Sequence, residues 1–182
     1  ARFRGKSPGL LDRALWTIGD LLVFRPLRDK LGFVRVRIAY QAGASMSSDC
    51  FRFFHAIGVP VRQLYGLTES GIVTAHRDGD IDPESVGRPL QEGSVRISER
   101  GEIIVRTNRM CNGYYKNEEA TRELFDSEGW LHTGDGGYLT ESGHLIYLDR
   151  VKDLVRLADG GWYAPQYIES KLGFSPYIKY AM

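Results

Sequence analysis

The chain has 182 residues, of which 42% are hydrophobic and 26% are charged, and its formal net charge at pH 7 is +1. This composition is typical of a soluble globular protein with room for one domain of ordinary size, or for one domain and part of another. The small net charge gives no reason to expect a nucleic acid as a partner, and no apolar run approaches the ~20 residues of a transmembrane segment. No secretory signal or disulfide pattern is visible around the two cysteines, so we expect a cytoplasmic protein.

The first elements expected along the chain are helices. Apolar residues recur at helical spacing over residues 10–24, and Pro26 is expected to break this helix before a shorter one that runs to Leu31. Basic residues crowd the start of the first helix; we interpret them as a solvated basic face, with contact to a membrane surface as the alternative. Residues 34–40 then alternate between apolar and polar side chains, which predicts a strand.

A loop of small side chains, Gly43-Ala44-Ser45, follows this strand, and such side chains let a flat ring approach the backbone closely. The alternative is an ordinary strand–helix connection capped by Ser47 or Ser48. A helix over residues 49–57 and a strand over residues 61–65 are expected next. Strand, helix and strand in this order, with the proposed ligand loops at the carboxyl ends of the strands, predict part of a doubly wound α/β sheet.

The stretch over residues 63–71 carries the most chemistry. Gly66 follows the strand and is expected to let the backbone turn sharply. Thr68 and Glu69 come directly after it, and both are hard oxygen ligands of the kind that hold Mg²⁺ beside phosphates. Tyr65 offers a flat ring at the strand end, where open α/β sheets bind ligands. The alternative is a strand exit at which Thr68 and Glu69 cap a helix.

The later part of the chain has a different character. Short strands such as residues 95–97 and 102–105 are separated by glycine turns, which predicts a small antiparallel β subdomain, a distorted barrel, over roughly residues 85–149. Asn117 is expected to cap a short helix within it. Asp135 lies among glycines, so its carboxylate is unhindered; it is suited to accept from both hydroxyls of a ribose, or it simply forms a turn.

Four stretches of the chain, in the right order, resemble motifs of the adenylate-forming (AMP-binding) superfamily: residues 42–45, 63–71, 129–135 and 149–153. One short motif would be weak evidence, because such patterns recur by chance, but four in register are a strong signal. The tail over residues 157–169 looks most like the long-chain fatty acyl-CoA synthetase branch, and residues 175–179 resemble the same branch. One departure is Gly136, where the superfamily usually has a branched apolar residue.

The resemblance implies roles for the motif residues. Tyr65 would stack on adenine, Asp135 and Arg150 would hold the ribose, and Thr68 and Glu69 would place Mg²⁺ and phosphate. Lys152 would be the hinge about which a small C-terminal domain swings between half-reactions. The residues that the resemblance assigns to nucleotide binding are Gly43, Ala44, Ser45, Gln63, Leu64, Tyr65, Gly66, Thr68, Asp135 and Arg150.

The resemblance also implies an activity. A long-chain fatty acid would react with ATP, in the presence of Mg²⁺, to give an acyl-adenylate, from which CoA would displace AMP. The superfamily's phosphate loop and its C-terminal catalytic lysine do not occur in this sequence. We therefore expect a fragment, inactive without the remainder of its parent chain, in a cytoplasmic or membrane-peripheral enzyme. A luciferase-like enzyme, a peptide-synthetase adenylation domain and a non-enzymatic relative are the alternatives.

The expected division of the chain has three parts. Residues 1–84 would belong to the nucleotide-binding α/β subdomain and residues 85–149 to the β subdomain. Residues 150–182 would hold the hinge and the truncated start of a C-terminal α+β domain.

Overall fold

The computed structural model describes residues 9–43, 46–157, 162–165, 168–169, 172 and 177–178. The helical segments are α1 (Leu10–Gly19), the π-helical turn η1 (Asp20–Phe24), α2 (Arg25–Lys30), α3 (Ser48–Ala56), α4 (Glu118–Leu124) and the 3₁₀ turn η2 (Val151–Asp153). The strands are β1 (Ala39–Gln41), β2 (Val61–Leu67), β3 (Gly71–Ala75), β4 (Arg88–Pro89), β5 (Val95–Ile97), β6 (Glu102–Val105), β7 (Leu131–Leu139), β8 (Leu145–Arg150), β9 (Val155–Arg156) and β10 (Trp162–Tyr163).

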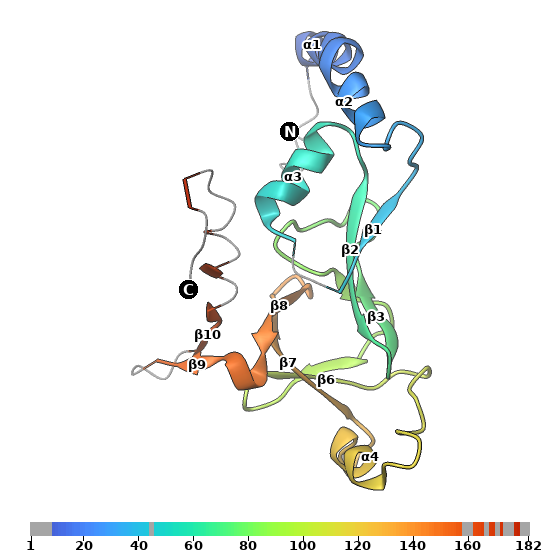
Figure 1. Ribbon diagram of the computed structural model, residues 1–182, viewed down its shortest axis with the longest axis vertical. Coiled ribbons are helices and arrows are strands. Elements are labelled where there is room, and N and C mark those ends of the chain that lie inside the picture. Colours follow the sequence, from blue (N-terminus) through green and yellow to red (C-terminus); the bar gives the residue numbers. More distant parts are fainter. Residues whose placement is uncertain are drawn as a thin grey trace.

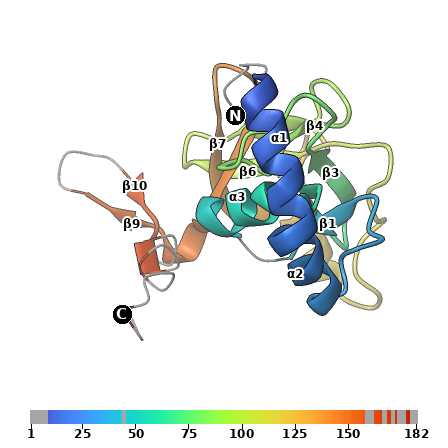
Figure 2. The same cartoon turned by 90° about the horizontal axis from the view of Figure 1, so that it is seen from above.

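Two four-stranded sheets form the centre of the described chain. The first has the order β1-β2-β3-β4 and the second the order β5-β6-β7-β8. Figure 1 shows the first sheet between the α1–α2 end of the molecule and the second sheet, with α4 at the opposite end. The short antiparallel pair β9–β10 follows η2 and projects from the main body in Figure 2.

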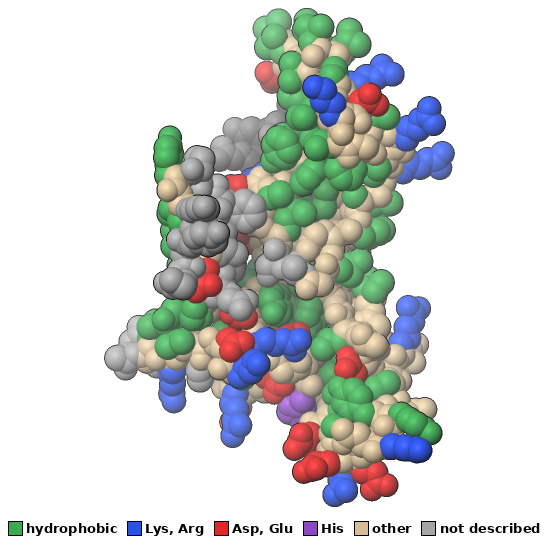
Figure 3. Space-filling view, in the orientation of Figure 1, with side chains coloured by type: hydrophobic (Ala, Val, Ile, Leu, Met, Phe, Trp, Pro, Cys, Tyr) green, Lys and Arg blue, Asp and Glu red, His purple; other side chains and the backbone are tan. Residues whose placement is uncertain are grey.

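The N-terminal helices form one continuous arm. The expected helix over residues 10–24 is present as α1 and η1, but Pro26 does not break it. Pro26 stands in the first turn of α2, directly after the π-helical turn η1, and the helical backbone continues through this junction, because Phe24 and Arg25 both keep helical dihedral angles. None of the residues of α1 or η1 is buried, and Leu10, Leu15 and Leu22 are among its exposed apolar side chains. Figure 3 shows hydrophobic side chains gathered at this end of the molecule.

The first sheet contains the expected strand–helix–strand unit. Strand β1 pairs with β2 in parallel, and α3 connects them, capped by Ser47, whose Oγ accepts from the Cys50 N–H at 3.2 Å. The mixed α/β class is therefore confirmed, although β3 and β4 pair antiparallel, so the sheet is mixed rather than wholly parallel. Phe51 of α3 packs in a buried cluster with Ile57, Val59 and Val61.

The prediction of a strand over residues 34–40 is mostly wrong, because the strand β1 comprises only Ala39–Gln41. Ala39 is paired with Val61, the first residue of β2, and Pro60 precedes it. Pro60 O accepts from the Ala39 N–H at 3.2 Å, but proline has no N–H to donate, so a longer β1 would lack this ladder donor. Alternating side chains alone cannot reveal this missing partner.

The second sheet confirms the expected small antiparallel β unit, because all three of its strand pairs are antiparallel. Asn117 caps α4 as expected, since its Oδ1 accepts from the Ala120 N–H at 3.1 Å. The two sheets share a core, in which Tyr65 and Val73 of the first sheet pack with residues of the second. The residues of the second sheet in that core include Val95, Ile103, Val105, Leu131 and Leu145.

Residues 86–89, before β5, form backbone hydrogen bonds with both sheets. Arg88 and Pro89 pair with β3 of the first sheet, while the Val86 N–H donates to Leu145 O of β8. The expected boundary near residue 84 stays a prediction, and it falls beside a segment that ties the two sheets together. Of the C-terminal part expected over residues 150–182, the described residues include η2, β9 and β10. Among the described residues there is no helix with the length and apolar character that spanning a membrane requires.

Gly66 has a different structural role from the one expected. Strand β2 continues through it to Leu67, and the chain turns at residues 68–70 before β3. A Cβ added at Gly66 would lie 2.1 Å from Gly71 O on the neighbouring strand. Glycine is needed here because two backbones approach closely, not because the backbone turns. Strand β3 follows at once, so the interpretation that Thr68 and Glu69 cap a helix is also wrong.

Candidate functional site

The candidate site begins with a contact between the two sheets. The Tyr65 hydroxyl, from β2, donates a 2.7 Å hydrogen bond to Asp135 Oδ2 in β7. Tyr65 is 9% exposed and Asp135 is 4% exposed, so this is a buried bond between residues 70 positions apart. Asp135 lies inside a strand, so it is not a turn-forming residue.

Arg150 approaches the same carboxylate from the neighbouring strand. It is the cross-strand partner of Asp135, and its Nη1 lies 3.0 Å from Asp135 Oδ1. The same Nη1 donates to Thr133 O at 3.2 Å, and its contact with Oδ1 lacks the geometry of a hydrogen bond. Oδ1 is therefore a buried oxygen with a charged neighbour but no hydrogen bond from the described residues. Buried polar atoms are usually satisfied, so this oxygen has free capacity to accept.

Burial sets the electrostatics of this cluster. It raises the pKa of the Asp135 carboxyl above its ordinary value, while the Tyr65 hydrogen bond and the Arg150 charge act in the opposite direction. Burial and the nearby Asp135 charge raise the pKa of Tyr65, so its hydroxyl stays protonated and donates. Burial also raises the pKa of Tyr147, whose ring centroid lies 6.0 Å from that of Tyr65, to about 12.

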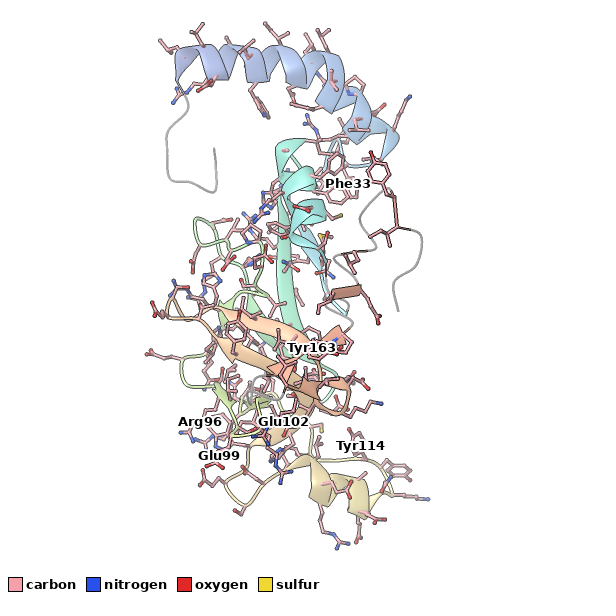
Figure 4. All side chains as sticks on the ribbon, turned by 90° about the vertical axis from the view of Figure 1, so that its left-hand side faces the viewer. Phe33, Arg96, Glu99, Glu102, Tyr114 and Tyr163 are labelled. Carbon is pink, nitrogen blue, oxygen red and sulfur yellow. The ribbon has the colours of Figure 1, made fainter. Side chains whose placement is uncertain are left out.

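Glu102 of β6 fixes the backbone that carries Asp135. Its Oε1 accepts from the Gly134 N–H at 2.8 Å, and its Oε2 lies 2.9 Å from His132 Nδ1, which donates to it. Gly134 has a φ of 69°, in the left-handed region. Figure 4 labels Glu102 on the second sheet. Sequence reasoning missed this residue; the only signal was an acid at the start of an otherwise apolar strand.

The glycine after Asp135 is explained by packing. Gly136 is buried, and a Cβ there would lie 2.5 Å from Leu154 Cδ1. Leu154, directly after η2, therefore occupies the space that a branched side chain at position 136 would take. The departure from the usual superfamily pattern leaves the Asp135 carboxylate in place.

Thr68 and Glu69 lie in the turn that joins β2 to β3. The Thr68 side chain is exposed, and Glu69 Oε1 accepts from the Tyr114 hydroxyl at 2.7 Å. No group of three or more His, Cys, Asp or Glu side chains that could hold a metal occurs in the described part of the chain. A cation at Thr68 and Glu69 would therefore need further oxygens from a ligand, which is how Mg²⁺ commonly binds beside phosphates.

The remaining expected site residues are dispersed. Gln63 is 3% exposed, and its amide donates to Pro83 O and Ser85 O, at 3.3 and 3.0 Å, so these bonds tie β2 to the segment before β4. Leu64 is half-buried in β2, and Gly43 is exposed at the end of the described segment. Ala44 and Ser45 lie outside the described residues, and Lys152 is exposed within η2.

The chain matches a known enzyme family. A family model described as "AMP-binding enzyme" matches residues 16–115, more than half of the chain. The chain belongs to this AMP-binding enzyme family. The model covers Tyr65, Thr68 and Glu69, whereas Asp135 and Arg150 lie beyond the part of this AMP-binding chain that it matches.

Similar curated proteins extend the match to nearly the whole AMP-binding chain. It is 38% identical over 177 residues to the long-chain-fatty-acid–CoA ligase FadD15 of Mycobacterium bovis, covering 97% of this chain and 29% of that protein. It is 37% identical to the peroxisomal long chain acyl-CoA synthetase 7 of Arabidopsis thaliana, covering 93% of this chain and 25% of that protein. The chain thus spans less than a third of the length of these relatives.

Solved structures of the same architecture include ATP-bound MatB from Rhodopseudomonas palustris, with a TM-score of 0.68 at 31% identity. That match covers 77% of the AMP-binding chain and 30% of MatB. A second is the o-succinylbenzoate CoA synthetase MenE of Bacillus subtilis in complex with an acyl-adenylate intermediate, with a TM-score of 0.68 at 29% identity. That match covers 80% of this chain and 32% of MenE.

Proposed function

We propose that the full-length protein containing this chain joins a long-chain fatty acid to CoA through an acyl-adenylate. The observation that carries the proposal is the buried Asp135 carboxylate, which holds one unsatisfied oxygen beside the Arg150 guanidinium. Curated relatives named as long-chain fatty acid–CoA ligases, at 34–38% identity, support the choice of acid. The chain spans 29% or less of the relatives cited above, so the activity is proposed for the whole protein.

The nucleotide would be recognised at the junction of the sheets. Asp135 Oδ1 is a buried oxygen with no hydrogen-bond donor among the described residues, and it would accept from a ribose hydroxyl once the nucleotide is seated, as acids in nucleotide sites do. The Arg150 side chain is 53% exposed, so its remaining N–H groups can reach a ribose or phosphate oxygen. Tyr65 would line the adenine pocket and orient Asp135; little of its ring is exposed for stacking. The loop Gly43-Ala44-Ser45 would form a second wall of the base pocket.

A divalent cation fits the β2–β3 turn only together with phosphates. The exposed Thr68 hydroxyl and the Glu69 carboxylate would hold Mg²⁺. When bound, the ion would neutralise charge on the phosphates of ATP. Coenzyme A would be the second substrate of the same enzyme.

The proposed reaction has two steps, formation of the acyl-adenylate and transfer of the acyl group to CoA. The fatty carboxylate oxygen forms a bond to the α-phosphorus of ATP, and the bond from that phosphorus to the leaving pyrophosphate breaks. The CoA thiol, losing its proton, then forms a C–S bond to the acyl carbon, and AMP leaves with the bonding electron pair. Negative charge develops on the phosphate oxygens in both steps, where a nearby guanidinium such as Arg150 is stabilising.

The proposal is tested by measuring acyl-CoA formation by the full-length protein from ATP, CoA and saturated acids of increasing chain length. We expect turnover to be greatest with long-chain acids, and none for the 182-residue chain alone. Activation of amino acids only, or of no acid, would overturn the proposal.

A further inference from the structure

The Glu69 carboxylate is hydrogen-bonded by a residue of the segment before α4, which is far away in the sequence. The Tyr114 hydroxyl donates to Glu69 Oε1 at 2.7 Å, across 45 positions. Figure 4 shows Tyr114 beside α4 at the lower end of the molecule. The superfamily motif around Glu69 says nothing about what orients its side chain, so this contact is a separate observation.

The same segment also holds the backbone of Glu69. The Cys111 N–H donates to Glu69 O at 2.7 Å. The β2–β3 turn is therefore held at two points, one on the main chain and one on the carboxylate. A carboxylate fixed in this way loses much of the rotamer freedom that an acidic side chain in a turn otherwise has.

Tyr114 is itself anchored on the first turn of α4. Its N–H donates to Thr121 Oγ1 at 2.9 Å, and that hydroxyl donates to Asn117 O at 2.7 Å. The preceding residue, Gly113, has a φ of 131°, and a Cβ there would lie 2.3 Å from Thr121 Cγ2. The phenol thus extends from a backbone that α4 holds through bonds that do not involve Glu69.

The chemistry of the contact suits a metal-binding carboxylate. Oε1 is occupied by the phenol, and Oε2 has no hydrogen bond or ion pair from the described residues. Carboxylates that bind metals are commonly hydrogen-bonded on their other oxygen, and these partners tune metal affinity.

We propose that Tyr114 is a positioning residue that orients Glu69 toward the cation bound with ATP. This proposal rests on the proposed function, because Glu69 is a cation ligand only if the protein binds metal and nucleotide together. A purely structural bond would instead tie α4 to the hairpin and affect only stability.

The test compares Tyr114→Phe with Tyr115→Phe in the full-length protein. Both changes remove one phenolic oxygen, but Tyr115 is 88% exposed, and its ring contact is with the neighbouring Lys116. Binding of Mn²⁺ in the presence of α,β-methylene-ATP is followed by electron paramagnetic resonance of the free ion. We expect Tyr114→Phe to weaken Mn²⁺ binding about 10–100-fold, and Tyr115→Phe to leave it unchanged.

A double variant distinguishes the loss of orientation at Glu69 from a general loss of structure. In Glu69→Gln, the additional change Tyr114→Phe should weaken Mn²⁺ binding by less than twofold, because the carboxylate that it orients is already gone. Equal Mn²⁺ affinity in wild type and Tyr114→Phe, or a full additive loss in the double variant, would overturn the proposal. If wild-type protein binds no Mn²⁺ with the nucleotide and forms no acyl-CoA, the proposed function fails instead.

Discussion

The hydroxyl of Tyr65 and the carboxylate of Asp135 form a buried 2.7 Å hydrogen bond that joins the first sheet to the second. Tyr65 is also part of the apolar core shared by the two sheets, so one residue both packs the junction and orients the acid. Both residues lie in superfamily motifs. The contact therefore ties these two motifs to each other.

Replacing Tyr65 with Phe should leave Asp135 Oδ2 buried without a donor. Leaving a buried acceptor unsatisfied costs about 1–3 kcal/mol, so we expect the free energy of unfolding to fall by that amount. Urea denaturation of the full-length protein measures it, with Tyr138→Phe on β7, which is 49% exposed, as the control. A fall no larger than the control's would mean that the bond contributes nothing to stability.

Glu102→Gln should disturb the backbone before Asp135, because the carboxylate accepts on two separate oxygens and glutamine replaces one of them with an NH₂ donor that would face Gly134 or His132. We expect AMP affinity to fall about tenfold, corresponding to one lost hydrogen bond of about 1.4 kcal/mol. Isothermal titration of AMP into the full-length protein measures the effect. Glu99→Gln, in the exposed turn before β6, is the matched control, and equal affinities in both variants would contradict the role of Glu102.

A buried histidine should make stability depend on pH. His76 Nδ1 accepts from the Gln63 N–H at 3.1 Å, so the neutral ring carries its proton on Nε2, which lies 3.1 Å from Ser85 Oγ. Ser85 Oγ lies 2.8 Å from His144 Nδ1, and His144 Nε2 lies 3.0 Å from Asp80 Oδ1. Burial lowers the pKa of His76 from 6.5 to about 4. Between pH 6.5 and about pH 4, His76 therefore carries a second ring proton in the unfolded chain but stays neutral in the folded one.

Because the unfolded state binds more protons in that window, the free energy of unfolding should fall as the pH drops from 6.5 toward 4. Between pH 7 and pH 5 the contribution of His76 is about 2 kcal/mol. Urea denaturation at both pH values should show a smaller loss in His76→Gln than in wild type. The same loss in both proteins would show that His76 is not the titrating group.

Lys152 tests the proposed hinge. It is exposed at the centre of η2, between β8 and β9. In Lys152→Pro the fixed φ and the missing N–H should restrict rotation, so thioester formation should fall more than adenylate formation. Single-turnover measurements of acyl-AMP formation and of its consumption by CoA separate the two steps. Lys152→Ala controls for the side chain alone, and equal losses in both steps for the proline variant would contradict a hinge at this residue.

Much of the local structure was predictable because its signals are local. Ser47 and Asn117 mark the starts of α3 and α4 by the hydrogen bonds that they offer their own helices. Glycine turns separate β5 from β6, so the antiparallel unit was visible in the sequence. These signals depend on neighbours a few residues away, which the sequence shows directly.

The site was less predictable because its contacts are between distant residues. The family resemblance pointed to Tyr65, Asp135 and Arg150, but it did not show that Tyr65 is bonded to Asp135 and is buried in the core shared by the two sheets. Gly66 was misread because its requirement comes from Gly71 O on the next strand. Glu102 and Tyr114 contact Gly134 and Glu69 from 32 and 45 positions away, and the sequence shows neither contact directly.

The most direct test is nucleotide use by Asp135→Asn in the full-length protein. The asparagine oxygen can still accept from the Tyr65 hydroxyl, but the substitution removes the negative charge and one acceptor oxygen. Because burial raises the pKa of Asp135, the ionised carboxylate opposes folding as the pH rises, so the variant should be no less stable at neutral pH.

The decisive measurement is the amount of long-chain acyl-adenylate formed from ATP and the acid, quantified by mass spectrometry. Asp153→Asn, an exposed change in η2, serves as the control. We expect wild type and the control to form the acyl-adenylate, and Asp135→Asn to form about 10–100-fold less, as expected for losing a charged hydrogen bond. Equal formation by Asp135→Asn and wild type would contradict the assignment of Asp135 to the nucleotide.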